Sequence, residues 1–430
     1  MNHDTERLVI VDGVRTPFTK MGTDLATVGA DELGATAVRA LLARTGYDAA
    51  TIDEVIFGCV GQPADAANVG RVIALKAGIP EHVPAITVHR NCASGCEAIT
   101  LAYEKMRAGR GTAFIVGGTE NMSQIPLFYS YAAAMKFAKL ARAKTPMEKL
   151  VSIFGFRISD FQPRVGIRLG LTDPVCGLNM GETAELIARE SGITREMMDQ
   201  FSVDSHKRAA AAVEKFAEEI CPAYVGPKFK APVTADNGIR KDQSMEALAK
   251  LQPVFERKTG MVTAGNSSQI TDGAVALLVM SESRAQKEGL APLGILTGYA
   301  YAACDPARMG LGPVYAMARA ETITGLGVDQ ADIIEINEAF AAQVLACIER
   351  AKSAEFAKKE LKRDKALGEL SRDRLNVNGG AIALGHPVGA SGARLALTAL
   401  KELKRRNGKR ALISLCVGGG QGAALWLERI

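Results

Sequence analysis

The chain has 430 residues, of which 47% are hydrophobic and 23% charged, and its net charge is +5. This composition excludes wholesale disorder, and the length suffices for about three domains with a large core that needs neither disulfides nor metal. The weak positive charge and the 5% of aromatic residues argue against a nucleic-acid partner, whereas a mildly basic protein suits an anionic small ligand.

The beginning of the chain, MNHDTERLVI, contains no apolar signal core. No apolar stretch of about 18 residues follows, so we expect neither a secretion signal nor a transmembrane helix. Eight cysteines are scattered along the chain, which predicts reduced thiols in a cytoplasmic protein.

Short apolar runs alternate with helical patterns over the first 120 residues. The sequence predicts strands within 7–18, 53–60 and 112–123, and helices at 31–45 and after the turn in 87–109. Such alternation predicts a parallel sheet that is covered on both faces.

From about residue 125 to 270 the pattern loosens into basic helical segments and turn formers, and the α/β pattern then returns. The segment 41–58 resembles 318–337, and ASGCEAITL resembles ASGARLALT near the end of the chain. An internal repeat of this kind indicates two similar α/β halves. We therefore predict an N-terminal domain over 1–121 and 272–291, an inserted loop domain over 122–271, and a C-terminal domain over 292–430.

Two cysteines are candidates for catalytic thiols. Cys92 lies in NCASG between a strand and a helix, where free backbone N–H groups and the helix dipole favour a nucleophilic thiolate. Cys416 ends an apolar strand and precedes GGGQG, in which Gly418 leaves backbone N–H groups free for an oxyanion. Taken alone, each cysteine is more often a buried core residue than a catalytic thiol.

A histidine and an asparagine are candidates for proton transfer and orientation. His386 lies in the glycine-rich loop GGAIALGHPVGASGAR, which could hold its imidazole for acid–base chemistry. Asn337 follows a strand in IEINEAFAAQ and could orient a water or an oxyanion. The alternatives are a structural loop histidine and a helix N-cap. Together the four motifs are expected to meet at one edge of the sheet.

In order and spacing, the motifs NCASG, NEAFAAQ, GHPVGASGAR and CVGGGQG resemble the active-site loops of the thiolase family, the acetyl-CoA C-acyltransferases, and so does VTAGNSSQITDGA. The resemblance implies two βαβαβαββ halves packed as α-β-α-β-α layers, with an inserted loop domain. It also implies a ping-pong mechanism in which Cys92 carries the acyl group and His386 activates it. Cys416 would donate or remove the α-carbon proton. His386, with a water held by Asn337, would form one oxyanion hole. The backbone N–H groups of Cys92 and Gly418 would form the other.

The same resemblance implies that CoA is a substrate bound against the inserted domain, with no cofactor and no metal. The positions that match CoA contacts in the family are Leu171, Met180, Arg240, Ala264, Ser268 and Phe340.

Two segments depart from the short-chain pattern. Residues 129–165 resemble the β-subunit of the fatty-acid β-oxidation complex, where such a segment serves long-chain substrates, an α-subunit or a membrane surface. Its alternating basic and apolar residues predict an interfacial helix, the alternative being an amphipathic lid. The Lys/Glu-rich stretch 350–374 is predicted to be a solvated, helix-rich excursion without catalytic role.

The leading hypothesis is a 3-ketoacyl-CoA thiolase of fatty-acid β-oxidation. The alternatives are a short-chain acetyl-CoA acetyltransferase, a ketoacyl synthase, which would lack Cys416, and a non-catalytic CoA or lipid carrier. Expected partners are further copies of the chain, as a homodimer or homotetramer, and a hydratase/dehydrogenase α-subunit. Membrane contact is expected only through 131–165.

Overall fold

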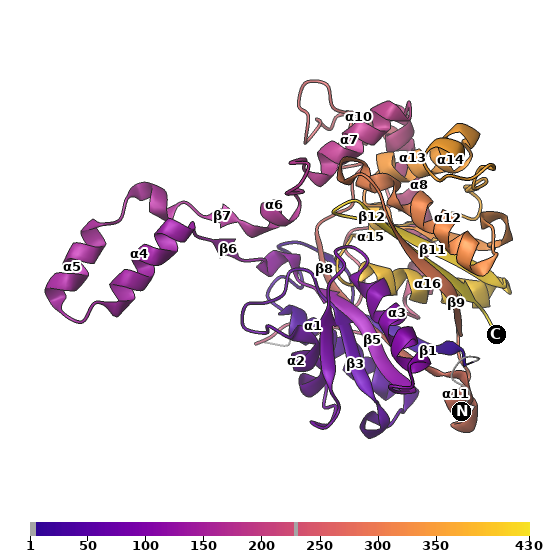
Figure 1. Cartoon of the computed structure of the whole chain (residues 1–430), viewed down its shortest axis with the longest axis horizontal. Coiled ribbons are helices and arrows are strands. Elements are labelled where there is room, and N and C mark those ends of the chain that lie inside the picture. Colours follow the sequence, from indigo (N-terminus) through magenta and orange to yellow (C-terminus); the bar gives the residue numbers. More distant parts are fainter. Residues whose placement is uncertain (1–5, 228–230) are drawn as a thin grey trace.

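The structure is a computed structural model that describes residues 6–227 and 231–430, so the first five residues of the predicted N-terminal domain lie outside it. Two groups of strands and helices form its body (Figure 1). The first group contains β1 (Leu8–Arg15), β2 (Thr19–Lys20), α1 (Ala30–Thr45), η1 (Ala49–Thr51), β3 (Glu54–Gly58), α2 (Val69–Lys76), β4 (Ala85–Val88), α3 (Ser94–Arg107), β5 (Ala113–Glu120), β8 (Thr271–Ser281) and α11 (Glu282–Lys287). The second contains β9 (Gly294–Ala303), η4 (Pro306–Leu311), α12 (Gly312–Thr324), η5 (Val328–Gln330), β10 (Ile333–Ile336), α13 (Ala341–Ala351), α14 (Ala354–Lys359), α15 (Ala381–Leu384), α16 (Ser391–Arg406), β11 (Arg410–Val417) and β12 (Gln421–Glu428).

An insertion separates β5 from β8. It contains η2 (Met122–Gln124), β6 (Leu127–Phe128), α4 (Tyr131–Arg142), α5 (Pro146–Phe154), η3 (Ile158–Phe161), β7 (Arg164–Val165), α6 (Gly166–Gly170), α7 (Met180–Glu190), α8 (Arg195–Ala211), α9 (Val213–Phe216) and α10 (Met245–Ala249). The predicted helices and strands of the first 120 residues are therefore present, and the insertion lies where the sequence pattern loosens.

A ten-stranded sheet runs in the order β10-β11-β12-β9-β1-β8-β5-β3-β4, with β2 paired to β8. The two halves meet at a short seam, where Val9 and Ile10 of β1 pair with Ile295 and Gly294 of β9. The prediction of a parallel sheet is correct only for β3 with β4 and β5 and for β10 with β11. The other pairs that form this sheet are antiparallel. A connection as short as the one between β11 and β12 can join only antiparallel neighbours.

Alternate side chains of the long strands point into different cores. On β8, Leu277 and Val279 belong to the core that contains α3 and α16, while Leu278 and Met280 belong to the core under α1 and α2. β11 divides its side chains in the same way between α16 and α12. The helices α3 and α16 thus lie between the two halves of the sheet, which gives the α-β-α-β-α order implied by the resemblance.

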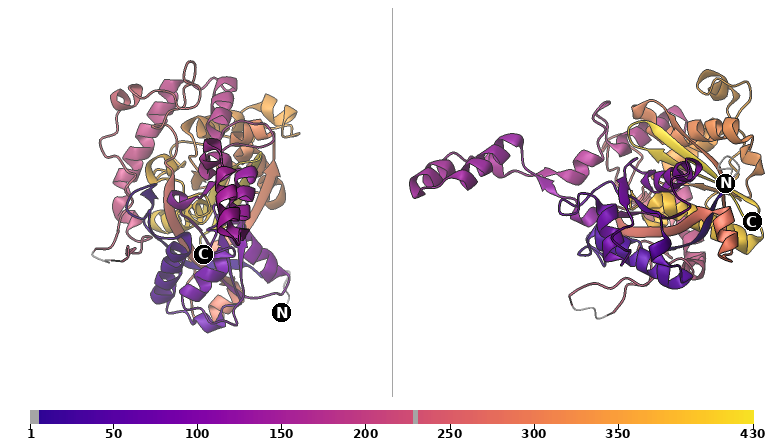
Figure 2. Two further views of the ribbon diagram at one scale, coloured as in Figure 1. Left: turned by 90° about the vertical axis from the view of Figure 1, so that its left-hand side faces the viewer. Right: turned by 60° about the horizontal axis from the view of Figure 1, so that its bottom comes forward.

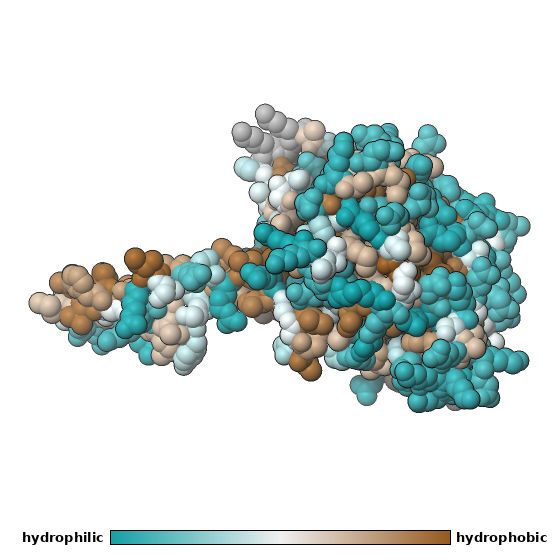
Figure 3. Space-filling view, turned by 90° about the horizontal axis from the view of Figure 1, so that it is seen from above, coloured by the Kyte–Doolittle hydropathy of each residue, from teal (hydrophilic) through white to brown (hydrophobic). Residues whose placement is uncertain are grey.

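A helical hairpin of α4 and α5 projects from the body on the two short strands β6 and β7 (Figures 1 and 2). Phe137 forms its small aromatic core with Tyr129, Phe156 and Phe161. Large apolar side chains remain exposed around this core, and Figure 3 shows them gathered toward the tip. The segment is helical and amphipathic as predicted, but it extends away from the body and does not cover it.

The stretch 350–374 is not merely a solvated excursion. Although its lysines are largely exposed, Phe356, Leu367 and Leu370 are buried in the core of the second half. Past α14 the stretch has no further helix. Three apolar side chains spaced among charges do not give a helical stripe, so their burial was not visible in the sequence.

Candidate active site

Cys92 lies in the turn between β4 and α3, directly after Asn91, whose φ of 42° is in the left-handed region. The backbone N–H groups of Gly418 and of Cys92 itself act to lower the pKa of its thiol. The Asn91 side chain donates to the Gly418 carbonyl at 2.8 Å, which fixes the glycine loop against the turn. The nucleophile predicted for the first half and the glycine predicted for the second are therefore in contact.

Burial, and not the helix terminus, sets the charge of this thiol. It raises the pKa of Cys92 to about 11, although the two N–H groups act in the opposite direction. The two N–H groups favour the thiolate as expected, but the desolvation cost outweighs them and favours the protonated thiol in the unliganded site. The thiol needs a base before it can attack.

His386 is the base that the structure offers. It is buried between α15 and α16, and burial, with the charge of Arg394, lowers its pKa to about 4. A neutral imidazole at pH 7 is free to accept a proton. Its Nε2 lies 3.4 Å from Nδ2 of Asn337, and its Nδ1 lies 2.6 Å from the hydroxyl of Ser391.

Cys416 and Asn337 complete the group of polar side chains. Cys416 ends β11 and is buried, and burial, followed by the neighbouring thiols of Cys92 and Cys347, raises its pKa well above the ordinary range. Asn337 follows β10, and its buried Oδ1 has no hydrogen-bond partner among the described residues. A buried amide oxygen without a partner is costly, which fits a group that binds water or substrate.

The loop 262–270 connects the site to the inserted domain. Ser268 donates its backbone N–H to Ala339 at 2.9 Å, and Ser267 pairs with Phe340 in an isolated bridge. One residue further on, the Gln269 carbonyl accepts the N–H of His386 at 3.1 Å. The predicted CoA contacts Ser268 and Phe340 thus flank the catalytic loops.

Some of the remaining predicted CoA contacts lie close to the catalytic loops, and others do not. The N–H of Met180 donates to Leu171, and the Met180 sulfur lies 3.5 Å from the position that a Cβ on Gly418 would take. Ala264 is exposed at the start of its loop. Arg240 is an exposed residue whose backbone N–H donates to His206, and its guanidinium makes no described contact with the catalytic loops.

Sequence reasoning missed three residues that hold the loops. Glu338 accepts hydrogen bonds from Ser205, Asn376 and the N–H of Ile382. Glu120 accepts from the N–H of Gly61 and, at 2.8 Å, from Gly389 in the histidine loop. Ser391 contacts His386 directly. For Glu120 the signal in the sequence was a carboxylate at the end of a buried strand, in GGTEN. For Glu338 it was a carboxylate next to Asn337, in NEAF. Buried carboxylates need hydrogen-bond partners.

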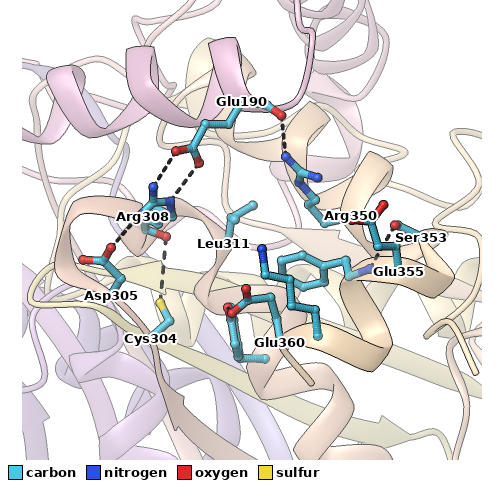
Figure 4. A pocket seen from close by; sticks show the side chains of 12 residues that line it. Glu190, Cys304, Asp305, Arg308, Leu311, Arg350, Ser353, Glu355 and Glu360 are labelled. Atoms are coloured by element: carbon cyan, nitrogen blue, oxygen red, sulfur yellow. Dashed lines mark hydrogen bonds and ion pairs between the residues drawn. The ribbon is translucent and has the colours of Figure 1, made fainter. Parts of the chain in front are cut away.

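A separate cavity of about 690 Å³ lies between the C-terminal end of α7, η4 and α14 (Figure 4). Its charged groups bind one another: Arg308 pairs with Glu190 and Asp305, and Arg350 donates to the Glu190 carbonyl. The Cys304 thiol and the side chains of Glu355 and Lys359 also line this cavity. None of the residues that line this cavity belongs to the four predicted motifs.

The comparisons with known proteins agree with this geometry. The thiolase N-terminal domain model matches residues 8–283, and the thiolase C-terminal domain model matches 290–429. A 3-ketoacyl-CoA thiolase of Serratia proteamaculans is 42% identical over 98% of this chain and 97% of its own length. The chain therefore belongs to the thiolase family, and its enzymatic class is that of an acyltransferase.

Solved structures give the same result. The crystal structure of a Bacillus anthracis acetyl-CoA acetyltransferase superposes with a TM-score of 0.85 at 36% identity and covers 99% of both chains. That of the human mitochondrial 3-ketoacyl-CoA thiolase in complex with CoA gives a TM-score of 0.84 at 34% identity, covering 99% of this chain and 98% of that one. No helix within residues 6–227 and 231–430 is both long and apolar enough to cross a membrane.

Proposed function

We propose that the chain cleaves 3-ketoacyl-CoA with CoA to acetyl-CoA and a shortened acyl-CoA, and catalyses the reverse Claisen condensation, through an acyl group on Cys92. The observation that carries the proposal is the Cys92 thiol, whose pKa two backbone N–H groups act to lower, beside the second thiol of Cys416. His386 and Asn337 form a second pair of polar groups, with Nε2 and Nδ2 3.4 Å apart. Two thiols with two separate groups of donors are what enolate chemistry at a thioester requires.

In the first half-reaction, His386 takes the proton of Cys92 at Nε2, and the sulfur attacks the 3-keto carbon. The bond between the α-carbon and this carbon breaks, and its electron pair passes to the α-carbon as the enolate of acetyl-CoA. His386 and a water on Asn337 stabilise the enolate oxygen. The Cys416 thiol then protonates the α-carbon, which leaves a thiolate at Cys416 and an acyl group on Cys92.

In the second half-reaction, the Cys416 thiolate takes the proton of the incoming CoA thiol. The CoA sulfur attacks the acyl carbonyl, whose oxygen is stabilised by the N–H groups of Cys92 and Gly418. Cys92 leaves as the thiolate and recovers the proton from His386. CoA is a substrate throughout, and the proposal includes no cofactor and no metal.

The first experiment removes each thiol separately. We expect Cys92→Ala to abolish acyl-enzyme formation from an acyl-CoA, and Cys416→Ala to retain acylation of Cys92 while losing cleavage of the carbon–carbon bond. Cys221→Ala, which removes a buried thiol from another segment, is the control. Mass spectrometry of the acylated protein and a thiolysis assay give the two readouts. Normal thiolysis by Cys92→Ala would refute the mechanism and revive the carrier hypothesis.

We further propose that the substrate belongs to fatty-acid β-oxidation, with long acyl chains included. Support comes from the curated relatives named 3-ketoacyl-CoA thiolase and from the hairpin at 131–165. The test is thiolysis of 3-ketoacyl-CoA esters from short to long chains. Activity confined to acetoacetyl-CoA would favour the short-chain acetyl-CoA acetyltransferase.

The finer proposals on assembly follow from the same hypothesis. We propose a cytoplasmic homodimer or homotetramer whose hairpin contacts a hydratase/dehydrogenase α-subunit or a membrane surface, without nucleic acid. Tyr131, Phe154 and Ile158 of this segment are 81%, 79% and 94% exposed, respectively. Exposed apolar groups among lysines favour a contact surface over a solvated arm.

A further inference from the structure

Ser391 is the residue that the catalytic proposal leaves unexplained. It is the first residue of α16, is buried, and places its hydroxyl 2.6 Å from Nδ1 of His386. The same hydroxyl donates to the carbonyl of Pro387 at 3.0 Å. A serine that contacts Nδ1 of an imidazole can determine which ring nitrogen carries the proton and which is free to accept one.

Two hydrogen bonds to the His386 ring and one from Ser391 to Pro387 are consistent with a single protonation pattern. Asn337 presents its amide Nδ2, a donor, to Nε2 at 3.4 Å, an arrangement that favours the tautomer in which Nε2 carries no proton. The single ring proton of the neutral imidazole then lies on Nδ1 and is donated to the Ser391 hydroxyl. That hydroxyl can accept because its own proton is given to Pro387.

The surrounding loop holds this serine in place. Gly389 donates its N–H to the buried carboxylate of Glu120 at 2.8 Å, which ties the histidine loop to β5 of the first half. One residue after Ser391, a Cβ on Gly392 would lie 2.6 Å from the backbone nitrogen of Cys96. With α16 packed this closely on α3, the hydroxyl has little freedom to turn away from the ring.

We propose that Ser391 is a positioning residue that fixes the tautomer and the ring orientation of His386, so that Nε2 is the nitrogen that takes the proton of Cys92. When the imidazolium forms, one proton has moved from Sγ to Nε2, which then becomes a donor and gives up the hydrogen bond from Asn337. The Nδ1 proton stays where it was, still bonded to the serine, and no other proton moves. This inference rests on the proposed role of His386 as the base.

The test compares Ser391→Ala with Ser391→Thr, which keeps a hydroxyl. For Ser391→Ala we expect kcat of thiolysis to fall about tenfold to hundredfold, the range typical of a lost orienting contact, with KM little changed. Ser391→Thr should recover most of this loss. Ser202→Ala is the matched control, because it removes a buried hydroxyl that donates to a helix carbonyl of α8, away from the site.

A spectroscopic readout separates positioning from folding. In protein with 15N-labelled histidine, the His386 signals should show the proton on Nδ1 in the wild type and a shift toward Nε2 in Ser391→Ala, at an unchanged melting temperature. Unchanged kcat and tautomer in Ser391→Ala would overturn the inference, and so would a kcat loss that Ser391→Thr does not recover.

A third variant distinguishes this inference from the proposed function. If His386→Ala acylates Cys92 at the wild-type rate, the proposed role of His386 fails, and the inference fails with it. If His386→Ala is inactive while Ser391→Ala matches the wild type, only the role of Ser391 is refuted.

Discussion

Burial favours the uncharged forms of the two candidate catalytic thiols and of the candidate imidazole base. It raises the pKa of Cys92 to about 11 and lowers that of His386 to about 4, so the unliganded site contains a thiol and a neutral imidazole. A neutral site protects the thiols from premature reaction, and it admits a thioester without first breaking an ion pair. Proton transfer then has to be coupled to attack.

A direct consequence concerns the reactivity of the free enzyme. The rate of Cys92 alkylation by iodoacetamide should rise with pH from 6 to about 10, because only the thiolate reacts and its pKa is raised. The measurement is the rate of label incorporation at Cys92, followed by mass spectrometry, with Cys92→Ala as the blank. A plateau near pH 7 would show instead that Cys92 and His386 form an ion pair in the free enzyme.

At the scale of residues, the sequence predicts those that react better than those that hold them. Cys92, His386, Asn337 and Cys416 lie in short motifs whose chemistry is visible without a structure. Ser391 contacts His386 only because the Gly-Ala turn between them folds back, and this depends on packing against the first half. Arg240 lies on a variable loop with its side chain exposed, and its contact with CoA stays a prediction.

Among the elements, the contact between α3 and α16 is what joins the two halves behind the site. A Cβ on Gly95 would lie 2.6 Å from the backbone nitrogen of Ala393, closer than side-chain carbons approach backbone atoms. The repeat in the sequence predicted two similar helices but not their crossing. Small residues at the same place in both copies, in ASGC and ASGA, were the available signal.

Replacing this glycine should therefore be costly. We expect Gly95→Ala to lower the free energy of unfolding by roughly 2–4 kcal/mol, because the backbones of two helices would have to separate. Gly170→Ala is the control, since a Cβ there meets open space and should change stability by less than about 0.5 kcal/mol. Urea unfolding of both variants provides the measurement. Equal stability of the two variants would show that the crossing is looser than the structure describes.

The hairpin gives a second prediction at this scale. Because α4 packs on aromatic rings of its own segment and the hairpin extends from the body, a chain in which 131–161 is replaced by a short Gly/Ser linker should fold and retain thiolysis of acetoacetyl-CoA. It should lose binding to vesicles that contain anionic lipid, measured by flotation. If the full chain does not float with such vesicles, the membrane proposal is wrong and the α-subunit remains the candidate partner.

For the whole molecule, the long-range ion pairs could not be predicted from the sequence. Arg15 of β1 binds both carboxylate oxygens of Asp236, 221 positions away, and also reaches Glu219. The domain order and the insertion follow from local patterns, whereas these contacts depend on where the insertion returns to the body. The mixed sheet was missed because strand direction within each half depends on how the chain returns to the sheet, as when β8 follows the insertion and pairs with β1 and β5.

The pH dependence of stability at the buried His206 reports on how tightly the insertion packs against the first half. His206 of α8 accepts the N–H of Arg240, and burial, with the charges of Arg240 and Lys20, lowers its pKa from 6.5 to about 4. Because the folded pKa is below the unfolded one, the neutral ring contributes stability that is present above about pH 6.5 and is lost as the pH falls toward 4. The contribution amounts to about 3 kcal/mol.

We therefore expect the stability advantage of the wild type over His206→Gln to shrink by about 3 kcal/mol between pH 7 and pH 4. The comparison with the variant cancels the opposing effect of buried carboxyls, among them Glu335, whose pKa is raised to about 8. His82→Gln, at an exposed position, controls for the loss of an imidazole. His206 lies on α8, and the charges that act on it are those of Lys20 in β2 and Arg240 in the loop after α9. Protonation of His206 would therefore place a third positive charge where the insertion joins the body. A pH-independent difference between wild type and His206→Gln would mean that this junction stays open to water.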